Sequence, residues 1–285
     1  MQVPASFQYR KATSVENALA LLAEYGPESA VVAGGHSLLP MMKLRLAHPE
    51  ALIDINDLTE LAGIRAGRDE LVIGAMARHA ELLASAVAGQ HFPILHDAER
   101  VIADPIVRNR GTVGGSLCQA DPSEDLSAVF AALRAELVAR GPEGARTVAV
   151  RDFFVGPYET VLADGELLVE IRVPLRKAAS AYLKVDRRAG DWAVGAAGAV
   201  VSLADGVVAE VGIGLTALGA PRFVAEEAED YLRGGPPTEA RLVEAGRIAA
   251  AHCAPTADQR GPVDYKRHLA GELVTRALRT AVGRA

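Results

Sequence analysis

Apolar side chains in the first 56 residues alternate between strand-like and helix-like spacing. Short apolar runs predict three strands, at 7–10, 29–33 and 51–55. After the first strand, apolar residues recur at the i, i+3, i+4 and i+7 positions of an amphipathic helix: Val15, Ala18, Leu19 and Leu22. Thr13 and Glu16 form a capping-box pattern at its start, and Gly26-Pro27 ends it. With a second helix predicted over 37–46, the segment predicts a small βαβ unit.

The middle of the chain, about 57–177, mixes strand and helix signals. Short strands are predicted at 71–73, 147–150, 160–162 and 167–173. Asp164-Gly165 is a turn signal that pairs the last two strands as a hairpin. The clearest helix signal is Asp121-Pro122-Ser123-Glu124, an N-cap Asp followed by a first-turn Pro and by Glu at the third helical position. The apolar stripe of this helix is Leu126, Val129, Phe130 and Leu133.

After Pro174 the pattern changes to strands that are followed by helices. Residues 193–203 and 207–218 are apolar runs on either side of Asp205-Gly206, which predicts an antiparallel hairpin. Helical stretches follow near 222–233, 238–253 and 263–282. This order is typical of an α+β unit, here a small sheet with a cluster of helices.

Composition places the chain among globular proteins. Its 285 residues are 50% apolar and 23% charged, and this length predicts about two domains. The formal net charge of −6 argues against a nucleic-acid partner. The first 14 residues contain no apolar signal core, and no run of 18 apolar residues occurs. We therefore expect a cytoplasmic protein with no transmembrane segment.

Few residues of this chain suit metal binding or covalent catalysis. Cys118 and Cys253 are too few for a disulfide framework, an iron–sulfur cluster or a Cys-rich zinc site built from this chain alone. The seven His show no HExxH or other paired metal-ligand spacing, and no GxSxG elbow or Cys–His pattern marks a nucleophile. We expect neither a metal ion nor a catalytic residue in this chain.

Two glycine pairs carry the strongest chemical signal, Gly34-Gly35 within 33–37 and Gly114-Gly115 within 112–116. Glycine lets the backbone approach a bulky anion and turn its N–H groups toward it. One such loop suits a phosphate, and two loops about 80 residues apart suggest a ligand whose central pyrophosphate is held from both sides. Neither G-x-G-x-x-G nor G-x-x-x-x-G-K-[ST] occurs, so neither a Rossmann nor a P-loop site is supported.

Each of these features also has a purely structural interpretation. A single glycine pair is often only a tight turn, and Lys43 and Arg45 suit the solvated face of a helix better than a phosphate contact. His36 lies inside the first loop, where a turn residue and a ligand contact are equally consistent with the sequence.

Several segments, in this order, resemble the motifs of the FAD-binding medium subunits of molybdenum hydroxylases. Val31–Pro40, with Lys43 and Arg45 beyond it, resembles the first FAD motif of that family. Arg108–Ser116 followed by Asp121–Leu126 resembles the second motif, and 184–193 resembles the segment that opens the family's C-terminal domain. The resemblance runs nearly from end to end and is closest to the aerobic carbon monoxide dehydrogenase branch. Flavin domains of xanthine dehydrogenases are more distant.

The resemblance implies FAD bound in a fold of the vanillyl-alcohol-oxidase (PCMH) type over 1–177, with subdomains of about 1–56 and 57–177, followed by a C-terminal flavoprotein domain over 178–285. It implies a large partner subunit with molybdenum–molybdopterin and a small one with [2Fe–2S] clusters, paired as a dimer of heterotrimers. Electrons would pass from those clusters through FAD to an external acceptor. Carbon monoxide is the favoured substrate, while xanthine, aldehydes and aromatic compounds stay open. Such a complex would lie in the cytoplasm or at the inner face of the membrane.

The resemblance also assigns the cofactor-binding residues. Residues near the pyrophosphate and its neighbouring groups are Val32, Ala33, Gly34, Gly35, His36, Ser37 and Leu38. The second loop, which would approach the flavin, contributes Thr112, Val113, Gly114, Gly115 and Ser116. Single positions complete the set: Ile102, Asp125, Leu168, Lys184 and Trp192. Among these, Asp125 stands where the family has an acid that is hydrogen-bonded to the cofactor.

Some alternatives stay open. Relatives of the carbon monoxide dehydrogenase branch are expected to have a tyrosine over the isoalloxazine ring near Trp192; Trp192 would cover the ring with its own π-face or pack at a domain interface. Ile102 and Leu168 suit the hydrophobic core as well as direct contact. Two other functions are a stand-alone FAD-dependent reductase or oxidase of the same superfold, which needs its own proton donor near the flavin, and a non-catalytic nucleotide-binding module.

Overall fold

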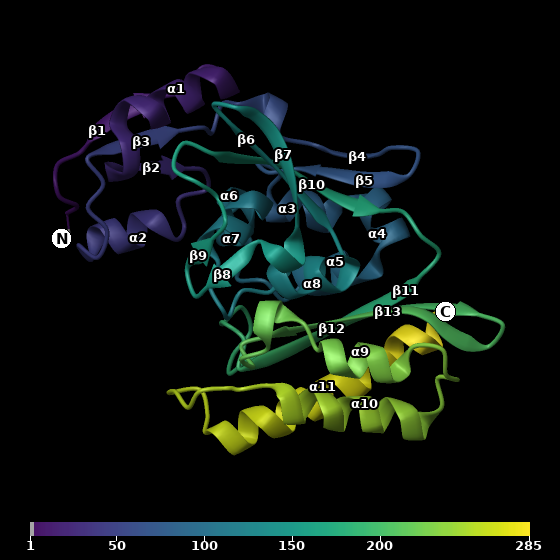
Figure 1. The fold of residues 1–285 in the computed structure, drawn as a ribbon. Helices are drawn as coiled ribbons and strands as arrows, with labels where there is room; N and C mark the ends of the chain where they lie inside the picture. Colours follow the sequence, from purple (N-terminus) through teal and green to yellow (C-terminus); the bar gives the residue numbers. More distant parts are fainter. Residues whose placement is uncertain (1–2) are drawn as a thin grey trace.

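The computed structural model describes residues 3–285 and shows a layered molecule (Figure 1). The N-terminal layer is a parallel sheet with the strand order β1-β3-β2, formed by β1 (Gln8–Lys11), β2 (Ser29–Val32) and β3 (Ala51–Asp54). Two helices connect these strands, α1 (Val15–Tyr25) and α2 (Leu38–Lys43). The predicted βαβ unit is confirmed, with α2 shorter than the predicted 37–46.

The start of α1 differs from the prediction by one residue. Ser14 is the N-cap in place of Thr13, because its side chain accepts the N–H of Asn17 at 3.1 Å. Asn17 in turn accepts the N–H of Thr13 at 3.1 Å. Ser14 therefore caps the helix, while Asn17 binds the residue before the cap, so the reciprocal pair predicted for Thr13 and Glu16 does not form.

The middle of the chain forms an antiparallel sheet with helices packed beside it. Its strand order is β4-β5-β10-β6-β7, with β4 (Ile64–Ala66), β5 (Glu70–Gly74), β10 (Leu167–Pro174), β6 (Glu136–Gly141) and β7 (Gly144–Ala149). The helices are α3 (His79–Ala84), α4 (Ala86–His91), α5 (Pro93–Glu99), α6 (Pro105–Arg110), α7 (Val113–Gln119) and α8 (Leu126–Leu133). In Figure 1, α5 and α8 lie between this sheet and the C-terminal sheet.

The helix predicted to follow Asp121 begins later, at Leu126. Residues 121–124 form a turn in which the Asp121 carboxylate accepts the N–H of Ser123 at 2.8 Å. Glu124 satisfies the first N–H groups of the helix instead, because its carboxylate accepts from Leu126 at 2.9 Å and from Ser127. A carboxylate three residues nearer to the helix therefore replaces the predicted cap.

The hairpin predicted around Asp164-Gly165 is wrong. Residue 160 ends β9 (Glu159–Thr160), which pairs with β8 (Phe154–Gly156), whereas β10 pairs with β5 and β6 from earlier in the chain. Gly165 still has a positive φ of 82°, so the turn signal itself was correct. Local sequence located the turn but not the strand that pairs with β10.

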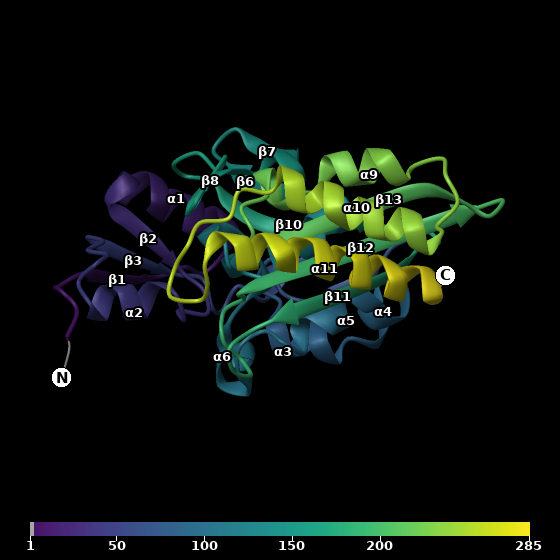
Figure 2. The same cartoon turned by 90° about the horizontal axis from the view of Figure 1, so that it is seen from below.

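The C-terminal part is an antiparallel sheet that helices cover on its outer face, as Figure 2 shows. Its strands lie in chain order: β11 (Ala179–Val185), β12 (Gly195–Ala204) and β13 (Val207–Thr216). The covering helices are α9 (Glu226–Leu232), α10 (Glu239–His252) and α11 (Val263–Gly283). The predicted hairpin and helices are confirmed, and β11 is an additional strand. Neither α11 nor any other helix within 3–285 has the length and apolar character needed to cross a membrane.

Two glycines let the C-terminal sheet pack directly on α8. A Cβ atom on Gly212 or Gly214 of β13 would lie 2.0 Å from the carbonyl oxygens of Ala132 and Ala128, respectively. Every residue of α8 is buried. This close packing gives the middle and C-terminal parts a common hydrophobic core.

Candidate cofactor site

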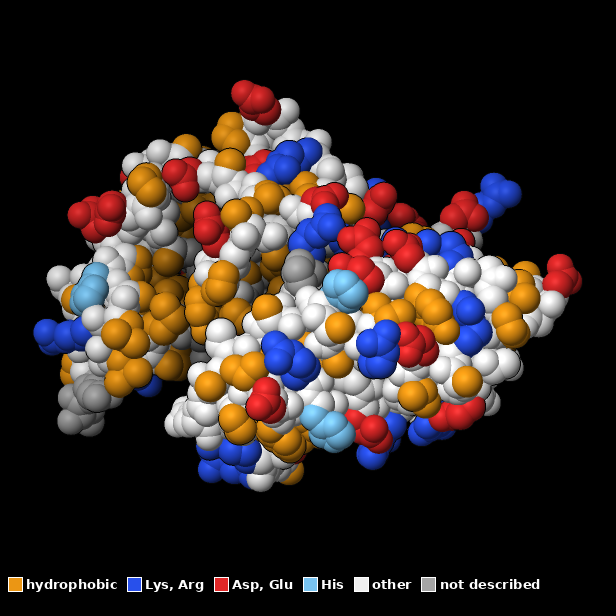
Figure 3. Space-filling view, turned by 60° about the horizontal axis from the view of Figure 1, so that its bottom comes forward, with side chains coloured by type: hydrophobic (Ala, Val, Ile, Leu, Met, Phe, Trp, Pro, Cys, Tyr) orange, Lys and Arg blue, Asp and Glu red, His pale blue; other side chains and the backbone are white. Residues whose placement is uncertain are grey.

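A cavity of about 580 Å³ is lined by all three parts of the chain. Figure 3 shows a hollow on one face of the molecule, with apolar side chains along its walls. The loop after β2 forms one side, and α7 with the residues before it forms another. Residues from β10, β11 and the segment after β11 complete the lining. The volume lies within the range of small-molecule sites, and both glycine loops meet at it.

The first glycine loop, residues 34–37, presents unpaired backbone donors. Across residues 3–285, no protein acceptor binds the N–H groups of Gly34, Gly35, His36 or Ser37. Gly35 has a φ of 80°, which favours glycine, and a Cβ on Gly34 would lie 2.4 Å from the Arg110 carbonyl oxygen. A row of free N–H groups beside a cavity is suited to an anion.

The second glycine loop, residues 112–116, is built differently. The Thr112 hydroxyl caps α7 by accepting the N–H of Gly115 at 3.1 Å, and the Thr112 carbonyl accepts the N–H of Ser116 at 3.0 Å. The N–H of Gly114 donates to the Ala75 carbonyl at 2.8 Å. Because these donors already have protein acceptors, the expectation that both loops turn free N–H groups toward a ligand is wrong for this loop.

The cavity brings together all but one of the residues that the sequence assigned to the cofactor. The lining contains Val32, Ala33, Gly34, Gly35, His36, Ser37, Leu38, Ile102, Thr112, Gly114, Gly115, Ser116, Asp125, Leu168, Lys184 and Trp192. Val113 is the exception, because its side chain is fully buried in the core and its N–H donates to the Ala77 carbonyl at 2.9 Å. Lys43 and Arg45 are exposed and lie outside the lining.

A buried ion pair joins two lining residues from distant segments. Lys184 Nζ lies 2.8 Å from Asp125 Oδ2 and 3.1 Å from the Val101 carbonyl oxygen. The Tyr182 hydroxyl donates to Asp125 Oδ1 at 2.7 Å. Burial raises the pKa of Asp125, and Lys184 and Tyr182 counteract part of that rise. These contacts fix a polar wall at the boundary between the middle and C-terminal parts.

Sequence reasoning missed two polar residues of this wall, Tyr182 and Glu124. Tyr182 precedes Lys184 by two residues in β11, so the period of the strand places both side chains on one face, and that spacing was an available signal. Glu124 lines the cavity, and burial raises its pKa to about 7. Its sequence position indicated only a helix cap, so its buried acid was not predictable.

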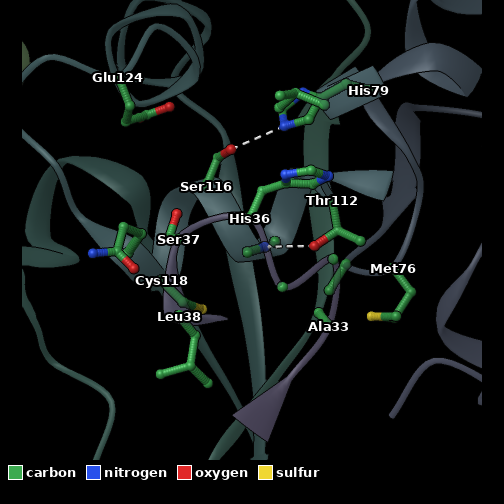
Figure 4. Close-up of a pocket in the computed structure, with 18 of the residues that line it drawn as sticks. Ala33, His36, Ser37, Leu38, Met76, His79, Thr112, Ser116, Cys118 and Glu124 are labelled. Atoms are coloured by element: carbon green, nitrogen blue, oxygen red, sulfur yellow. Dashed lines mark hydrogen bonds between the residues drawn. The ribbon is translucent and has the colours of Figure 1, made fainter. Parts of the chain in front are cut away.

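A hydrogen-bonded chain of side chains, also missed, ends at the cavity. His79 Nδ1 lies 3.0 Å from Glu99 Oε1, and His79 Nε2 lies 3.0 Å from the Ser116 hydroxyl (Figure 4). Glu99 is fully buried and His79 is 3% exposed. Burial disfavours the charged imidazole, but Glu99, with smaller effects of Glu124 and Asp125, raises the pKa of His79 overall. The three residues of the chain belong to three helices, and no motif links them.

Trp192 and Ile102 lie at the lining, as does the core residue Leu168. Trp192 is 44% exposed, so it is not a core residue. Its segment packs against the turn before α6, where a Cβ on Gly190 would lie 2.9 Å from the Ala103 carbonyl oxygen. Ile102 and Leu168 contact the hydrophobic core and also line the cavity, so the two interpretations of these residues are compatible.

Comparison with known proteins gives concordant results for both halves of the chain. Residues 5–176 match the family described as FAD binding domain in molybdopterin dehydrogenase, and residues 180–281 match the CO dehydrogenase flavoprotein C-terminal domain. The carbon monoxide dehydrogenase medium chain of Hydrogenophaga pseudoflava is 42% identical over 284 residues, with 99% of each chain covered. The medium chain of Afipia carboxidovorans is 40% identical over 285 residues, again with 99% of each covered. A solved structure of the H. pseudoflava enzyme, which lacks the Mo-pyranopterin moiety, has a TM-score of 0.96 at 44% identity, with 99% of each chain covered.

Proposed function

Because the chain belongs to the family of FAD-binding flavoproteins of molybdopterin dehydrogenases and has their two-domain fold, we propose that its cavity holds FAD for electron transfer within a carbon monoxide dehydrogenase complex. The observation that carries the proposal is the row of N–H groups at 34–37 that have no acceptor among the described residues 3–285. The pyrophosphate of FAD is an anion that needs such donors. FAD supplies the ability to accept and release electrons, and the protein positions it.

The residues of this cavity fit FAD. Gly34 through Ser37 would bind the pyrophosphate, while apolar lining residues such as Ile102 would contact the rings. Asp125, held by Lys184 and Tyr182, would offer a fixed polar group to the cofactor. Trp192 would cover a flavin face with its π-surface. In this proposal these groups bind and orient the cofactor.

The relatives support a division of labour within the complex. Two of them are medium chains of carbon monoxide dehydrogenases. We infer a complex with a large molybdenum–molybdopterin subunit, which converts CO and water to CO2, protons and electrons, and a small [2Fe–2S] subunit. Electrons pass from its clusters to the FAD of this chain and then to an external acceptor. The proposed complex is a dimer of heterotrimers in the cytoplasm. Within this chain, the proposed domains are residues 1–177 and 178–285.

Co-expression of the chain with its proposed partners tests this function. The purified complex should contain about one FAD for each copy of the chain, released by acid without covalent attachment. Anaerobic carbon monoxide should bleach the flavin absorbance of the complex, whereas the isolated chain supplied with FAD should stay oxidised because it has no group that activates the substrate. Bleaching of the isolated chain would contradict the proposal and favour a stand-alone flavoenzyme.

A further inference from the structure

We propose that Glu99, His79 and Ser116 form a proton-controlled donor: the second of two protons held by the Glu99–His79 pair, the one on His79 Nε2, turns the Ser116 hydroxyl toward an anionic oxygen of the FAD pyrophosphate. The three side chains come from α5, α3 and α7 and form one continuous hydrogen-bonded chain. The inference rests on the FAD site proposed above. It adds a group whose donor direction depends on protonation to a site otherwise described by fixed backbone donors.

The number of protons on the pair determines the direction of the Ser116 hydrogen bond. With a proton between Nδ1 and Glu99 and a second proton on Nε2, the imidazole donates to the Ser116 oxygen and the hydroxyl hydrogen is free to point into the cavity. This holds whether the shared proton resides on Nδ1 or on the carboxylate. When the pair loses one proton, Nε2 becomes an acceptor, so the Ser116 hydroxyl donates to it and only a lone pair faces the cavity.

The chain ends beside the loop that carries the free N–H groups. A Cβ on Gly34 would lie 2.8 Å from Gly111 Cα, and a Cβ on Gly111 would lie 2.9 Å from His79 Cδ2. Loop 34–37, Gly111 and the His79 ring are therefore successive neighbours. Ser116, Ser37 and His36 line the same cavity and are drawn together in Figure 4. An anion held by loop 34–37 would thus share the cavity with the Ser116 hydroxyl.

The surrounding charges favour the protonated pair. Glu99 contacts His79 directly, and the carboxylates of Glu124 and Asp125 lie in the turn before α8. Arg108 of α6 acts on Glu99, and Lys184 of β11 is paired with Asp125. Although burial opposes the imidazolium, the acidic neighbours raise the pKa of His79. The pair is therefore protonated to a higher pH than an ordinary histidine.

Glu124 is the competing source of a pH effect. Its side chain lines the same cavity, and its pKa is about 7. Ionisation of Glu124 would place a negative charge beside an anionic ligand and would also weaken binding as the pH rises. A pH dependence by itself therefore does not identify the pair, and the test must separate these two groups.

The experiment uses the assembled complex with its FAD removed, and measures the FAD dissociation constant from flavin fluorescence between about pH 6 and pH 9. The FAD pyrophosphate keeps its charge over this range. A change of the dissociation constant with pH, called the slope below, therefore arises from the protein. We expect affinity to fall by up to about tenfold per pH unit above the pKa of the free pair. Calorimetry in two buffers of different ionisation enthalpy should show proton uptake on binding. ADP-ribose, a pyrophosphate diester without a flavin, should show the same slope.

Variants assign the slope to a group. Ser116→Ala should weaken FAD binding at pH 6 and abolish the slope. His79→Gln should abolish the slope while keeping much of the low-pH affinity, because the carboxamide N–H donates to Ser116 at every pH. Glu124→Gln should keep the slope. Ser202→Ala, a matched change on β12 whose hydroxyl donates to the Lys177 carbonyl, should change neither quantity.

Several results would overturn the inference. A slope that persists in Ser116→Ala and vanishes in Glu124→Gln would assign the titration to Glu124. Tight FAD binding without pH dependence or proton uptake in the unmodified complex would refute the proton-controlled donor but not the FAD site. A slope with FAD but not with ADP-ribose would refute the pyrophosphate as the acceptor. A complex that takes up no FAD at any pH would refute the proposed function, and with it the proton-controlled donor.

Discussion

The two glycine loops at the cavity are alike in sequence and different in structure. In loop 34–37 the N–H groups have no protein acceptor within residues 3–285, and Gly35 adopts a positive φ of 80°. In loop 112–116 the Thr112 hydroxyl and nearby carbonyls accept the N–H groups, and Gly114 has no positive φ. Within residues 3–285, the first loop leaves its N–H groups free beside the cavity. The second is a helix start whose N–H groups are bonded within the protein, while its Ser116 side chain lines the cavity.

The residue before each helix explains the difference. Thr112 caps α7 with its side chain, whereas Ser37 at the start of α2 makes no side-chain cap hydrogen bond. The glycines are needed for different reasons as well: Gly35 for its backbone conformation and Gly114 for close contact with Ala75. A Gly-Gly pair therefore indicates close backbone approach, and each loop has a protein neighbour: the Arg110 carbonyl for Gly34 and Ala75 for Gly114. Within residues 3–285, only the first loop also leaves its N–H groups without a protein acceptor.

The largest effect is expected for Gly35→Val. A β-branched side chain at this φ is strained, and its Cβ would lie 2.9 Å from the Leu39 side chain. The change displaces the unpaired N–H groups, so FAD affinity should fall about 1,000-fold, or about 4 kcal/mol. Gly206→Val is the matched control, because Gly206 has a φ of 76° with no atom within 4 Å of a Cβ. The control should keep its FAD. Full FAD occupancy in Gly35→Val would contradict the binding of FAD by loop 34–37.

Glu124, which follows the second glycine loop in the chain, is expected to make the free energy of unfolding depend on pH. The pKa of Glu124 is about 7 in the folded chain, above its unfolded value, so the folded state holds this proton more tightly. The protonated Glu124 side chain contributes up to about 3 kcal/mol to the free energy of unfolding. This contribution is fully present below the pKa of Glu124 in the unfolded chain and is lost as the pH rises through about 7. Urea midpoints of the isolated chain at about pH 5 and pH 8 should differ less in Glu124→Gln than in the wild type. An equal difference would refute the assignment.

Gly114→Ala should reduce stability rather than only remove the ligand. A Cβ there would lie 2.6 Å from Ala75 Cβ and 2.8 Å from the Ala75 carbonyl oxygen, so the backbone must shift. We expect a loss of about 2 kcal/mol in the free energy of unfolding, read from the urea midpoint. Gly35→Ala is the comparison: the strain at its φ of 80° should cost about 1 kcal/mol of stability, and its larger effect should be weaker FAD binding. If Gly114→Ala were stable and merely lacked FAD, the two loops would be equivalent after all.

Thr112→Ala should have the smallest effect. It removes the side-chain cap that accepts the Gly115 N–H, which typically costs about 1 kcal/mol of stability. Thr112→Ser keeps an oxygen at the same position and should unfold at nearly the wild-type urea concentration. A loss of the same size in Thr112→Ser would show that the Thr112 methyl group, and not the cap, stabilises α7.

Much of the fold and most of the cavity could be predicted because the signals are local. The helices after Pro174 have regular apolar spacing, and both glycine loops stand next to recognisable elements. The pairing of β10 could not be predicted, because its partners come from distant segments. The Glu99–His79–Ser116 chain was invisible for the same reason: its members are 20 and 37 residues from His79, on three helices.

The most direct test follows absorbance after anaerobic carbon monoxide is mixed rapidly with the assembled complex. The account predicts that iron–sulfur absorbance bleaches before or together with flavin absorbance in the wild type. In the Gly35→Val complex the clusters should still be reduced, without a flavin signal and without transfer to an external acceptor. Acceptor reduction at the wild-type rate in that flavin-free complex, or flavin bleaching ahead of the clusters, would contradict an electron path that runs from the clusters through the FAD of this chain.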